Sequence, residues 1–327
     1  MSVIFFDTEK QDQQLVLSHF PDATFAARGL PASDLISLCK DAEIISTFIT
    51  TAFPREVLLQ LPKLKLLLTR SVGFDHIDVP TCIEKGITVC NVPDYGSHVI
   101  AEHVFALLLS TLRHIPAGNA RVESGTFDYH GLRGMALKDK TIGIVGTGKI
   151  GRRVARIARG FDMNILAVDQ CRTLELEEFY GVHYTMLDDL LAHSDIVSLH
   201  VPAFAETKHM INKASIAKMK DGVILVNTAR GSLIKSDDLL EALNSGKVAL
   251  ALLDVLEHEE NFSDNKALVD HPHVVTTPHI AFYADDSLRN MYMDCFQSIE
   301  QWKRGEKPMH MIALEKVVCD LPGVKKV

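Results

Sequence analysis

Residues 141–151 read TIGIVGTGKIG and decide the fold of this chain. The first five are an apolar run typical of a buried strand, and residues 152–160 continue as a helical stretch. Gly146 permits a tight turn, Gly148 lets the backbone approach a pyrophosphate, and Gly151 lets the helix pack closely on the strand. The N-terminus of that helix offers N–H groups and the positive end of its dipole to phosphates. The sequence therefore predicts a strand–turn–helix unit that binds a dinucleotide.

An acidic residue follows the next predicted strand. Asp169 comes directly after residues 164–168, about 20 residues beyond the glycine turn. A carboxylate there accepts hydrogen bonds from the adenosine ribose and repels a 2′-phosphate, so we expect NAD rather than NADP. Arg172 lies close by and leaves a smaller NADP possibility open. Lys149 and Ile150 complete the set of residues expected in the loop.

Apolar runs alternate with helical stretches on both sides of this unit. They show no in/out alternation, which is typical of parallel sheets buried on both faces. With about 150 residues per domain, 327 residues predict two such domains, so we expect an α/β fold with two doubly wound parallel sheets. The predicted strands are residues 3–6, 44–48, 64–68, 87–90, 141–145, 164–168, 196–199, 223–226, 248–253 and 274–276.

Two long helical stretches, residues 97–116 and 285–304, flank the middle block of strands. Each would be about 30 Å long, enough to lead from one domain to another. The middle block is therefore predicted to be inserted into a domain built from both ends of the chain. We expect one domain over residues 1–98 plus 284–327 and a second over residues 99–283.

Composition excludes several classes of protein. Lys and Arg total 34 against 42 for Asp and Glu, a formal net charge of −8, which argues against nucleic acid as a partner. The chain has no apolar run of about 20 residues, so no membrane partner is expected. Residues 3–6 look like a first strand rather than a signal peptide, and a cytoplasmic protein is predicted. The six cysteines lack zinc-ligand spacing, so we expect buried apolar cysteines and neither a metal nor a disulfide framework.

Polar residues follow the later strands. Arg230 comes just after residues 223–226, Asp254 ends residues 248–253, and His279 follows residues 274–276. Ligands of open α/β sheets bind beyond the carboxyl ends of the strands, so these side chains are predicted to face one crevice. Taken singly, Arg230 could be a solvated surface arginine and His279 a structural histidine. Glu259 belongs to the acidic run 257–260, in which Glu257 or Glu260 could equally take its place.

These segments together resemble the D-isomer-specific 2-hydroxyacid dehydrogenases. The resemblance covers the chain from about residue 44 to residue 305 and implies a flavodoxin-like substrate domain, a Rossmann NAD domain and an active site in an interdomain cleft. It also implies a homodimer formed through the NAD domains, for which the apolar helix 99–112 could be the surface or could equally be core. Besides the glycine turn, the matching segments are residues 70–78, 91–93, 200–202, 227–231, 253–259 and 278–280.

The resemblance implies catalytic roles that agree with the chemistry of a 2-keto acid. Arg230 would hold the substrate carboxylate with two hydrogen bonds and polarise the carbonyl. His279 would be the general acid for reduction and the base for oxidation. Glu259, five residues after Asp254, would orient the ring and favour its imidazolium form, so reduction is expected to fade as pH rises.

Further contacts follow from the same resemblance. Asp254 would meet the nicotinamide carboxamide, and the backbone N–H groups around Val72 and Gly73 would bind the substrate carboxylate. Tyr95 either contacts the substrate or simply fills the turn at residues 91–96. The nicotinamide ribose and ring would be lined by Val201, Pro202, Thr207, Thr228, Ala229 and Arg230.

Aromatic side chains at Phe48, Phe282 and Tyr283 are expected to wall the substrate pocket and to favour pyruvate. One methylene is worth only about 1–3 kcal/mol, so a larger aliphatic side chain stays open. Within the family, dehydrogenases of 2-hydroxyisocaproate, glyoxylate or hydroxypyruvate, and 3-phosphoglycerate are the alternatives. An NAD-sensing, dimeric corepressor-like protein is the non-enzyme alternative. Two departures from the family are Asp162, where glycine is usual, and the tail 319–327.

Overall fold

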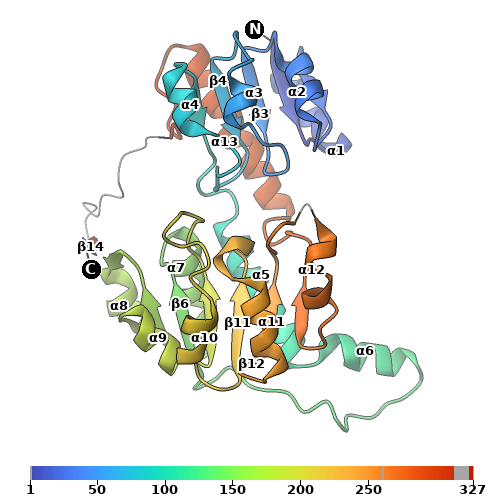
Figure 1. The fold of residues 1–327 in the computed structure, drawn as a ribbon, viewed down its shortest axis with the longest axis vertical. Coiled ribbons are helices and arrows are strands. Elements are labelled where there is room, and N and C mark those ends of the chain that lie inside the picture. The colour runs from blue at the N-terminus through green and yellow to red at the C-terminus, as the bar shows by residue number, and fades with distance from the viewer. Residues whose placement is uncertain (1, 260, 313–323, 327) are drawn as a thin grey trace. The chain divides into compact units, whose positions relative to one another are not determined.

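The computed structural model describes residues 2–259, 261–312 and 324–326, and the chain divides into two compact units. Unit 1 comprises Met1–Gly96 and Ala284–Lys316, and unit 2 comprises Ser97–Tyr283 and Val317–Val327. Each unit contains its own parallel sheet with helices on both faces (Figure 1). The predicted α/β class with two parallel sheets is confirmed.

The sheet of unit 1 has five strands in the order β2-β1-β3-β4-β5, all parallel to their neighbours. Every residue of its three central strands is buried, which is why these strands are apolar without alternation. The strands are β1 (Val3–Phe6), β2 (Thr24–Ala26), β3 (Ile44–Thr47), β4 (Leu66–Thr69) and β5 (Thr88–Cys90). The helices are α1 (Lys10–His19), α2 (Ala32–Cys39), α3 (Arg55–Leu58), α4 (Val79–Glu84) and α13 (Asp285–Lys303).

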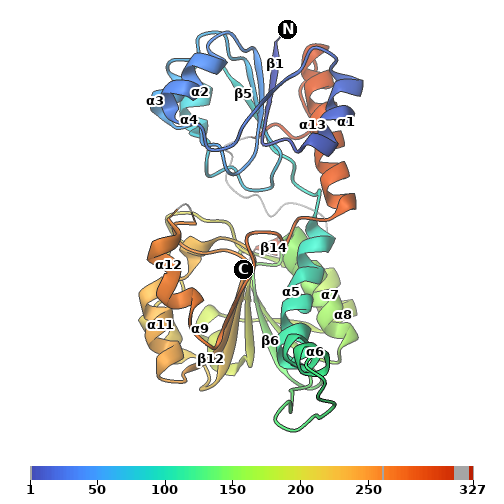
Figure 2. The same ribbon diagram turned by 90° about the vertical axis from the view of Figure 1, so that its right-hand side faces the viewer.

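Helices α2, α3 and α4 cover one face of this sheet, and α1 and α13 cover the other (Figure 2). On the second face, Phe296 of α13 lies 6.1 Å from Phe5 and 5.2 Å from Phe20, measured between ring centroids. The last long helix of the chain therefore completes the core around its first strand.

The sheet of unit 2 has seven parallel strands in the order β13-β12-β11-β10-β6-β7-β9. The strands are β6 (Thr141–Val145), β7 (Asn164–Val168), β9 (Val182–Tyr184), β10 (Ile196–Leu199), β11 (Val223–Asn227), β12 (Val248–Leu253) and β13 (Val274–Thr276). The helices are α5 (Ser97–Leu112), α6 (Ile115–Glu123), α7 (Lys149–Gly160), α8 (Leu174–Tyr180), α9 (Leu187–His193), α10 (Lys213–Lys218), α11 (Ser236–Asn244) and α12 (Phe262–Val269), with a 3₁₀ turn at Gly231–Leu233.

Two hydrophobic cores flank this sheet, one under α5, α7 and α8 and the other under α9 to α12. Ala101, Val104 and Leu108 of α5 are fully buried in the first core. The helix expected over residues 99–112 is thus core of its own unit, which excludes its buried face as a dimer surface.

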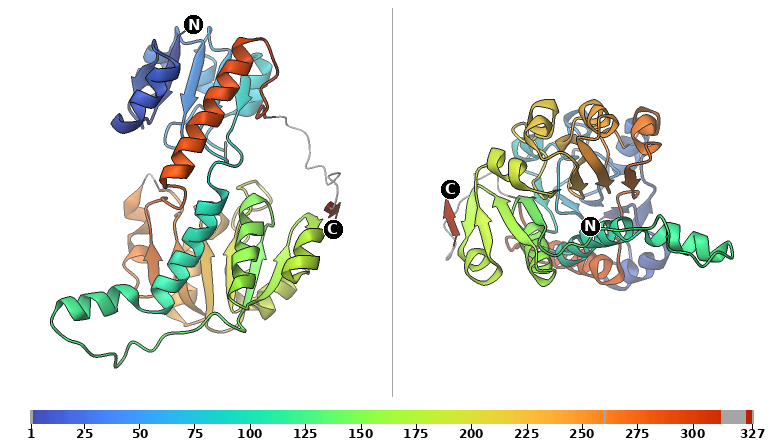
Figure 3. Two further views of the ribbon diagram at one scale, coloured as in Figure 1. Left: turned by 180° about the vertical axis from the view of Figure 1, so that it is seen from behind. Right: turned by 90° about the horizontal axis from the view of Figure 1, so that it is seen from below.

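The single helix expected over residues 97–116 is wrong, because the chain breaks after Leu112. His114 adopts a left-handed backbone, with φ of +52°, and α6 begins at the next residue. No residue of α6 is buried, and this helix and the loop after it extend away from the rest of unit 2 (Figure 3).

The C-terminal tail differs from the expected boundary. β14 (Val324–Lys326) pairs antiparallel with β8 (Cys171–Thr173) in unit 2, although residues 284–327 were expected to form one segment with the first domain. Cys171 is disulfide-bonded, so the expectation of unpaired cysteines is wrong for this residue. Four others are buried and free, as predicted: Cys39, Cys82, Cys90 and Cys295. The expectations for Cys319 and Glu260 fall outside the described residues.

Asp162 follows the C-terminal cap of α7 with a φ of +55°. Glycine is favoured at this position because it adopts a left-handed backbone without strain, and aspartate tolerates the conformation better than most residues. Within the described ranges, no helix is long and apolar enough to cross a bilayer. The same ranges contain no cluster of His, Cys, Asp and Glu suited to a metal ion.

Candidate active site

The glycine turn after β6 has the geometry that its sequence demands. Gly146 has a φ of +95°, and a Cβ atom there would lie 2.7 Å from the carbonyl oxygen of His200. A Cβ atom on Gly151 would lie 1.9 Å from the oxygen of Gly146, so neither position accepts a side chain. Around Gly148, by contrast, a Cβ atom would meet no atom within 4 Å. The turn is thus closed on the side of the sheet and open where Gly148 begins α7.

Gly148 is the N-cap of α7 and provides no side-chain cap to its first turn. The positive end of a 12-residue helix therefore faces the open side of the turn, next to Lys149 and Ile150. This arrangement suits an anion such as a pyrophosphate.

Asp169 is held firmly at the end of β7. Its Oδ1 accepts a hydrogen bond from Cys171 N at 2.9 Å, and its Oδ2 accepts from Thr147 N at 2.5 Å and Thr147 Oγ1 at 3.1 Å. The hydroxyl of Tyr184 lies 2.9 Å from Thr147 Oγ1 and accepts from Thr173 N. Asp169 is thereby a fixed negative charge beside the glycine turn.

Three features fit a bound dinucleotide. They are the open glycine turn at Gly148, the fixed carboxylate of Asp169 and a buried hydroxyl on Thr228. Thr228 Oγ1 is buried and has no hydrogen-bond partner among the described residues, although it follows β11 at the carboxyl edge of the sheet. Ala229 N donates to Asn227 Oδ1 at 3.0 Å, which fixes the backbone next to that hydroxyl.

The loop after β10 carries three further predicted residues. Thr207 Oγ1 donates to Pro202 O at 2.7 Å and accepts from Phe204 N at 2.8 Å, so the hydroxyl closes the loop that Val201 begins. His200 precedes this loop, lies 2.8 Å from Ser198 Oγ through its Nε2, and has a pKa that desolvation lowers to about 3. The imidazole is therefore neutral at physiological pH.

His279 and Glu259 form a pair. His279 Nδ1 lies 3.0 Å from Glu259 Oε2, and the other oxygen of Glu259 accepts from Leu256 N at 3.2 Å. The backbone of His279 is left-handed, with φ of +54°, and its N–H donates to Asp254 O at 2.9 Å. Such strained backbones occur at sites where the surrounding structure fixes a functional side chain.

Asp254, at the end of β12, holds the segment that carries His279. Its carboxylate is almost completely buried and accepts from Ile280 N and Ala281 N, both at 2.9 Å, and from Thr277 Oγ1 at 2.5 Å. His103 Nε2 of α5 lies 3.6 Å from Asp254 Oδ1. Sequence reasoning missed His103, since an isolated histidine on a core helix carries no recognisable signal.

Arg230 lies three residues after the end of β11, and hydrogen bonds to the backbone fix its position. Asn227 Nδ2 donates to Arg230 O at 2.8 Å, and Arg230 Nη1 donates to Ala229 O at 2.7 Å. A Cβ atom on Gly231 would lie 1.9 Å from Leu256 O, so the turn after Arg230 packs tightly against the segment that leads to Glu259.

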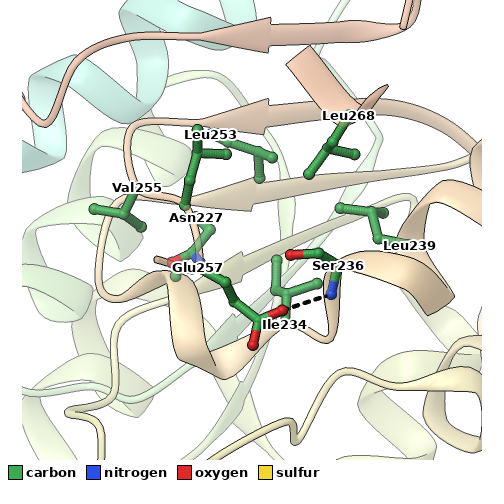
Figure 4. A pocket seen from close by; sticks show the side chains of 10 residues that line it. Asn227, Ile234, Ser236, Leu239, Leu253, Val255, Glu257 and Leu268 are labelled. Carbon is green, nitrogen blue, oxygen red and sulfur yellow. Dashed lines mark hydrogen bonds between the residues drawn. The ribbon is translucent and has the colours of Figure 1, made fainter. Parts of the chain in front are cut away.

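Glu257 contacts Ser236 and His209 and not His279, which distinguishes its role from that of Glu259. A small cavity of about 10 Å³ lies behind the Arg230 turn, and Glu257 and Ser236 lie on its lining (Figure 4). Glu257 accepts from Ser236 N at 2.8 Å and lies 2.5 Å from His209 Nε2. Burial alone raises the pKa of Glu257, but the hydrogen bonds from Ser236 and His209 outweigh it and lower that pKa. The carboxylate opposite His279 is Glu259, as predicted.

Unit 1 contains the predicted residues of the turn after β4 and Tyr95, and unit 2 contains Phe282. In the turn after β4, Ser71 Oγ donates to Gly73 O at 2.5 Å and Asn91 Nδ2 donates to Val72 O at 2.8 Å. Tyr95 is buried, with 5% of its surface exposed. In unit 2, the ring of Phe282 meets the His279 ring edge-on, with the centroids 6.4 Å apart.

Arg70, directly before this turn, is the buried residue that sequence reasoning missed. Its side chain is completely buried and donates to Phe6 O at 2.5 Å, Asp7 O at 3.2 Å and Ser46 Oγ at 2.8 Å. Its guanidinium carbon also lies 5.2 Å from the centroid of the Tyr292 ring. An arginine before a turn looks like a surface residue in sequence, because burial depends on strands distant along the chain.

The fold and this site define an oxidoreductase that binds a nicotinamide dinucleotide. Residues 105–281 match the model of the D-isomer specific 2-hydroxyacid dehydrogenase NAD binding domain. The chain belongs to the D-isomer specific 2-hydroxyacid dehydrogenase family. It is thus an NAD-dependent D-2-hydroxyacid dehydrogenase that acts on a small hydroxy or keto acid.

Three relatives show the range of this family. The glyoxylate reductase of Pyrococcus furiosus is 37% identical over 303 residues, which is 90% of each chain. The D-lactate dehydrogenase of Aquifex aeolicus, solved with NAD and lactic acid, is 35% identical with a TM-score of 0.84, covering 93% of this chain and 96% of that one. An acyclic imino acid reductase, solved with NADPH and D-Arg, is 27% identical with a TM-score of 0.85, covering 96% and 100%.

Proposed function

We propose that this enzyme reduces pyruvate to D-lactate with NADH, reversibly, as a D-lactate dehydrogenase. The observation that carries the proposal is the His279–Glu259 pair, with Nδ1 and Oε2 3.0 Å apart, on the sheet edge that also carries Arg230. Since Nδ1 faces the carboxylate, Nε2 is the atom left to exchange a proton with a substrate.

Arg230, His279 and Glu259 are assigned different roles in the reduction of a keto acid. The guanidinium of Arg230 holds the carboxylate and polarises the carbonyl, because its planar fork matches both oxygens. His279 Nε2 gives its proton to the carbonyl oxygen, and Glu259 holds the ring through Nδ1 during that transfer. Bound NADH supplies the hydride. In the reverse direction, neutral His279 takes the hydroxyl proton.

Unit 1 is proposed as the substrate domain and unit 2 as the NAD domain. The backbone N–H groups around Val72 and Gly73 are assigned to the substrate carboxylate, and Tyr95 to the substrate side chain. Gly146, Gly148, Lys149, Ile150 and Gly151 are assigned to the pyrophosphate, and Asp169 to the adenosine ribose. The nicotinamide half is assigned to Val201, Pro202, Thr207, Thr228, Ala229, Arg230 and Asp254.

Pyruvate is proposed over larger keto acids because Phe282 packs against the His279 ring. We assign this ring to the wall of the substrate pocket, where it would favour a side chain as small as a methyl group. Replacing it should therefore shift specificity toward branched substrates, by about tenfold or more for each methylene accommodated.

The test compares NADH oxidation with pyruvate, 2-ketoisocaproate, phenylpyruvate, hydroxypyruvate and glyoxylate. We expect the highest kcat/KM with pyruvate, and a rise for 2-ketoisocaproate in Phe282→Ala. The exposed Phe179→Ala is the matched control, which should leave the ranking unchanged. A higher kcat/KM with glyoxylate would overturn the pyruvate assignment in favour of the activity named for the Pyrococcus relative, and a higher kcat/KM with hydroxypyruvate would overturn it as well.

A homodimer through the NAD domains is proposed on the evidence of α6 and the loop after it. This segment contributes no buried residue from its helix, yet it exposes Ile115, Val122, Phe127 and Tyr129, with Phe127 94% exposed. Exposed apolar side chains on a helix without buried residues, and on the first part of the loop after it, fit a second copy of the chain. Sedimentation should show dimers for the wild type and for Phe179→Ser, and monomers for the Val122→Glu, Phe127→Ser double variant. A wild-type monomer would overturn the assignment.

A further inference from the structure

Arg172 is close in sequence to Asp169, the carboxylate proposed to bind the adenosine ribose, and its guanidinium already contacts other side chains. Arg172 follows Asp169 by three residues, and its guanidinium carbon lies 5.6 Å from the centroid of the Tyr184 ring. The hydroxyl of that ring lies 2.9 Å from Thr147 Oγ1, which in turn donates to Asp169 Oδ2. The guanidinium therefore stacks on a side chain that belongs to the hydrogen-bond network of Asp169.

Glu177, in the first turns of α8, pairs with this cation. Arg172 Nη2 donates to Glu177 Oε1 in an ion pair whose two side chains are 40% and 23% exposed. Arg172 Nε is buried and has no hydrogen-bond partner among the described residues. Nη2 of the guanidinium is thus bound to a carboxylate, while its Nε has no acceptor in the part of the chain that the structure describes.

This pairing opposes a 2′-phosphate. In dinucleotide folds an arginine near the ribose is the group that receives the 2′-phosphate of NADP. Here Asp169 and Glu177 both repel a phosphate, and Glu177 also occupies the arginine that would attract it. The fold as such does not exclude the larger cofactor, because the acyclic imino acid reductase of the same fold was solved with NADPH.

We propose that Glu177 is a specificity-determining residue that disfavours NADPH by holding Arg172. The proposal rests on the NAD use of the family and on the ribose contact proposed for Asp169, and it is independent of which keto acid is reduced. A partly exposed ion pair of this kind contributes about 1 kcal/mol, so a single substitution should release the guanidinium without unfolding α8.

The test titrates the purified enzyme with NADH and with NADPH, following nicotinamide fluorescence without any keto acid. Glu177→Gln should lower the Kd for NADPH by about three- to tenfold and change the Kd for NADH by less than about twofold. Glu178→Gln is the matched control, since it removes the same charge from the neighbouring, exposed position and should leave the ratio of the two Kd values unchanged.

A double variant tests whether the guanidinium of Arg172 causes the gain in NADPH affinity. Adding Arg172→Ala to Glu177→Gln should abolish the gain in NADPH affinity, because the gain comes from the released guanidinium. An unchanged ratio in Glu177→Gln, an equal gain in Glu178→Gln, or a gain that survives Arg172→Ala would each overturn it. Failure to turn over pyruvate would affect only the proposed substrate, whereas failure of the wild type to bind NADH would overturn both proposals.

Discussion

The two parallel sheets of this enzyme both bury a charged side chain where their strands end, but the charges have opposite sign. In unit 1, Arg70 follows β4 and donates to oxygens of residues in or just after β1 and β3. In unit 2, Asp254 follows β12 and accepts hydrogen bonds from the backbone of Ile280 and Ala281. Neither side chain exposes more than 1% of its surface.

The difference in sign determines what each charge holds. Strand ends offer carbonyl oxygens, so the cation of unit 1 ties strand to strand and fixes the turn that Ser71 begins. The anion of unit 2 collects N–H groups from the segment after β13, so it ties the sheet to the residues that follow His279. One edge is therefore reinforced as scaffold, and the other holds the segment that carries His279, the proposed proton donor.

The largest expected effect comes from His279 itself. His279→Gln should lower kcat about 10²- to 10⁴-fold, because the general acid is lost, while the Kd for NADH changes by less than about twofold. Steady-state rates and a fluorescence titration measure the two quantities. Activity close to that of the wild type would place the proton donor elsewhere.

Removing the buried cation should break the edge of unit 1. Arg70→Met leaves several buried oxygens without a donor, which should lower the free energy of unfolding by about 3 kcal/mol. The single tryptophan of the chain, Trp302, lies in α13, so its fluorescence during urea unfolding reports on this unit. Arg70→Lys should recover part of the loss, and an unchanged Trp302 transition in Arg70→Met would contradict the scaffold role.

Removing the buried anion should loosen the segment that carries His279 and leave unit 1 intact. Asp254→Asn turns one of the two oxygens into a donor, which then faces the N–H group of either Ile280 or Ala281, at a cost of about 1–3 kcal/mol. We expect a lower kcat with an unchanged Trp302 transition. A shift of that transition would show that the two edges are not held separately.

The last predicted effect concerns the pH dependence of stability and depends on His200, which follows β10 in unit 2. Desolvation lowers the pKa of His200 to about 3, below the ordinary value of 6.5. Between these two values, the imidazole is protonated in the unfolded chain and neutral in the folded chain. Stability should therefore decrease as pH falls below about 6.5, with a slope of up to about 1.4 kcal/mol per pH unit.

Replacing His200 with Gln should flatten this slope in circular-dichroism unfolding curves at pH 7, 6 and 5. The exposed His183→Gln is the control and should keep the slope of the wild type. Equal slopes in all three proteins would contradict the assignment of acid sensitivity to His200.

The sheets could be predicted from sequence wherever burial made strands continuously apolar. All ten predicted strands are present, whereas the edge strands β2 and β9 were missed because each exposes at least one residue and spans only three. The helix break at His114 was missed because the apolar pattern runs across it; only the backbone angle marks the end of α5.

The catalytic candidates were recognisable because each follows a strand and the family motif sets their order. The resemblance also chose Glu259 within its acidic run, and the contacts of Glu257 with Ser236 and His209 now explain why the neighbour is unsuited. Arg70, His103 and the ion pair of Arg172 with Glu177 could not be predicted. Their positions depend on which distant segments meet in space, and no local pattern encodes that.

The interruption of unit 1 has a consequence for the order in which the protein is made. On the ribosome, the seven strands of the unit 2 sheet have all emerged once Thr276 is exposed, but Phe5 still lacks Phe296 and Arg70 still lacks Tyr292. The first strand synthesised must therefore wait, with one aromatic face uncovered, until α13 is complete. The sheet of unit 2 is thus the first whose two faces can both be covered by helices, and the N-terminal part of the chain is the one that a chaperone would need to shield.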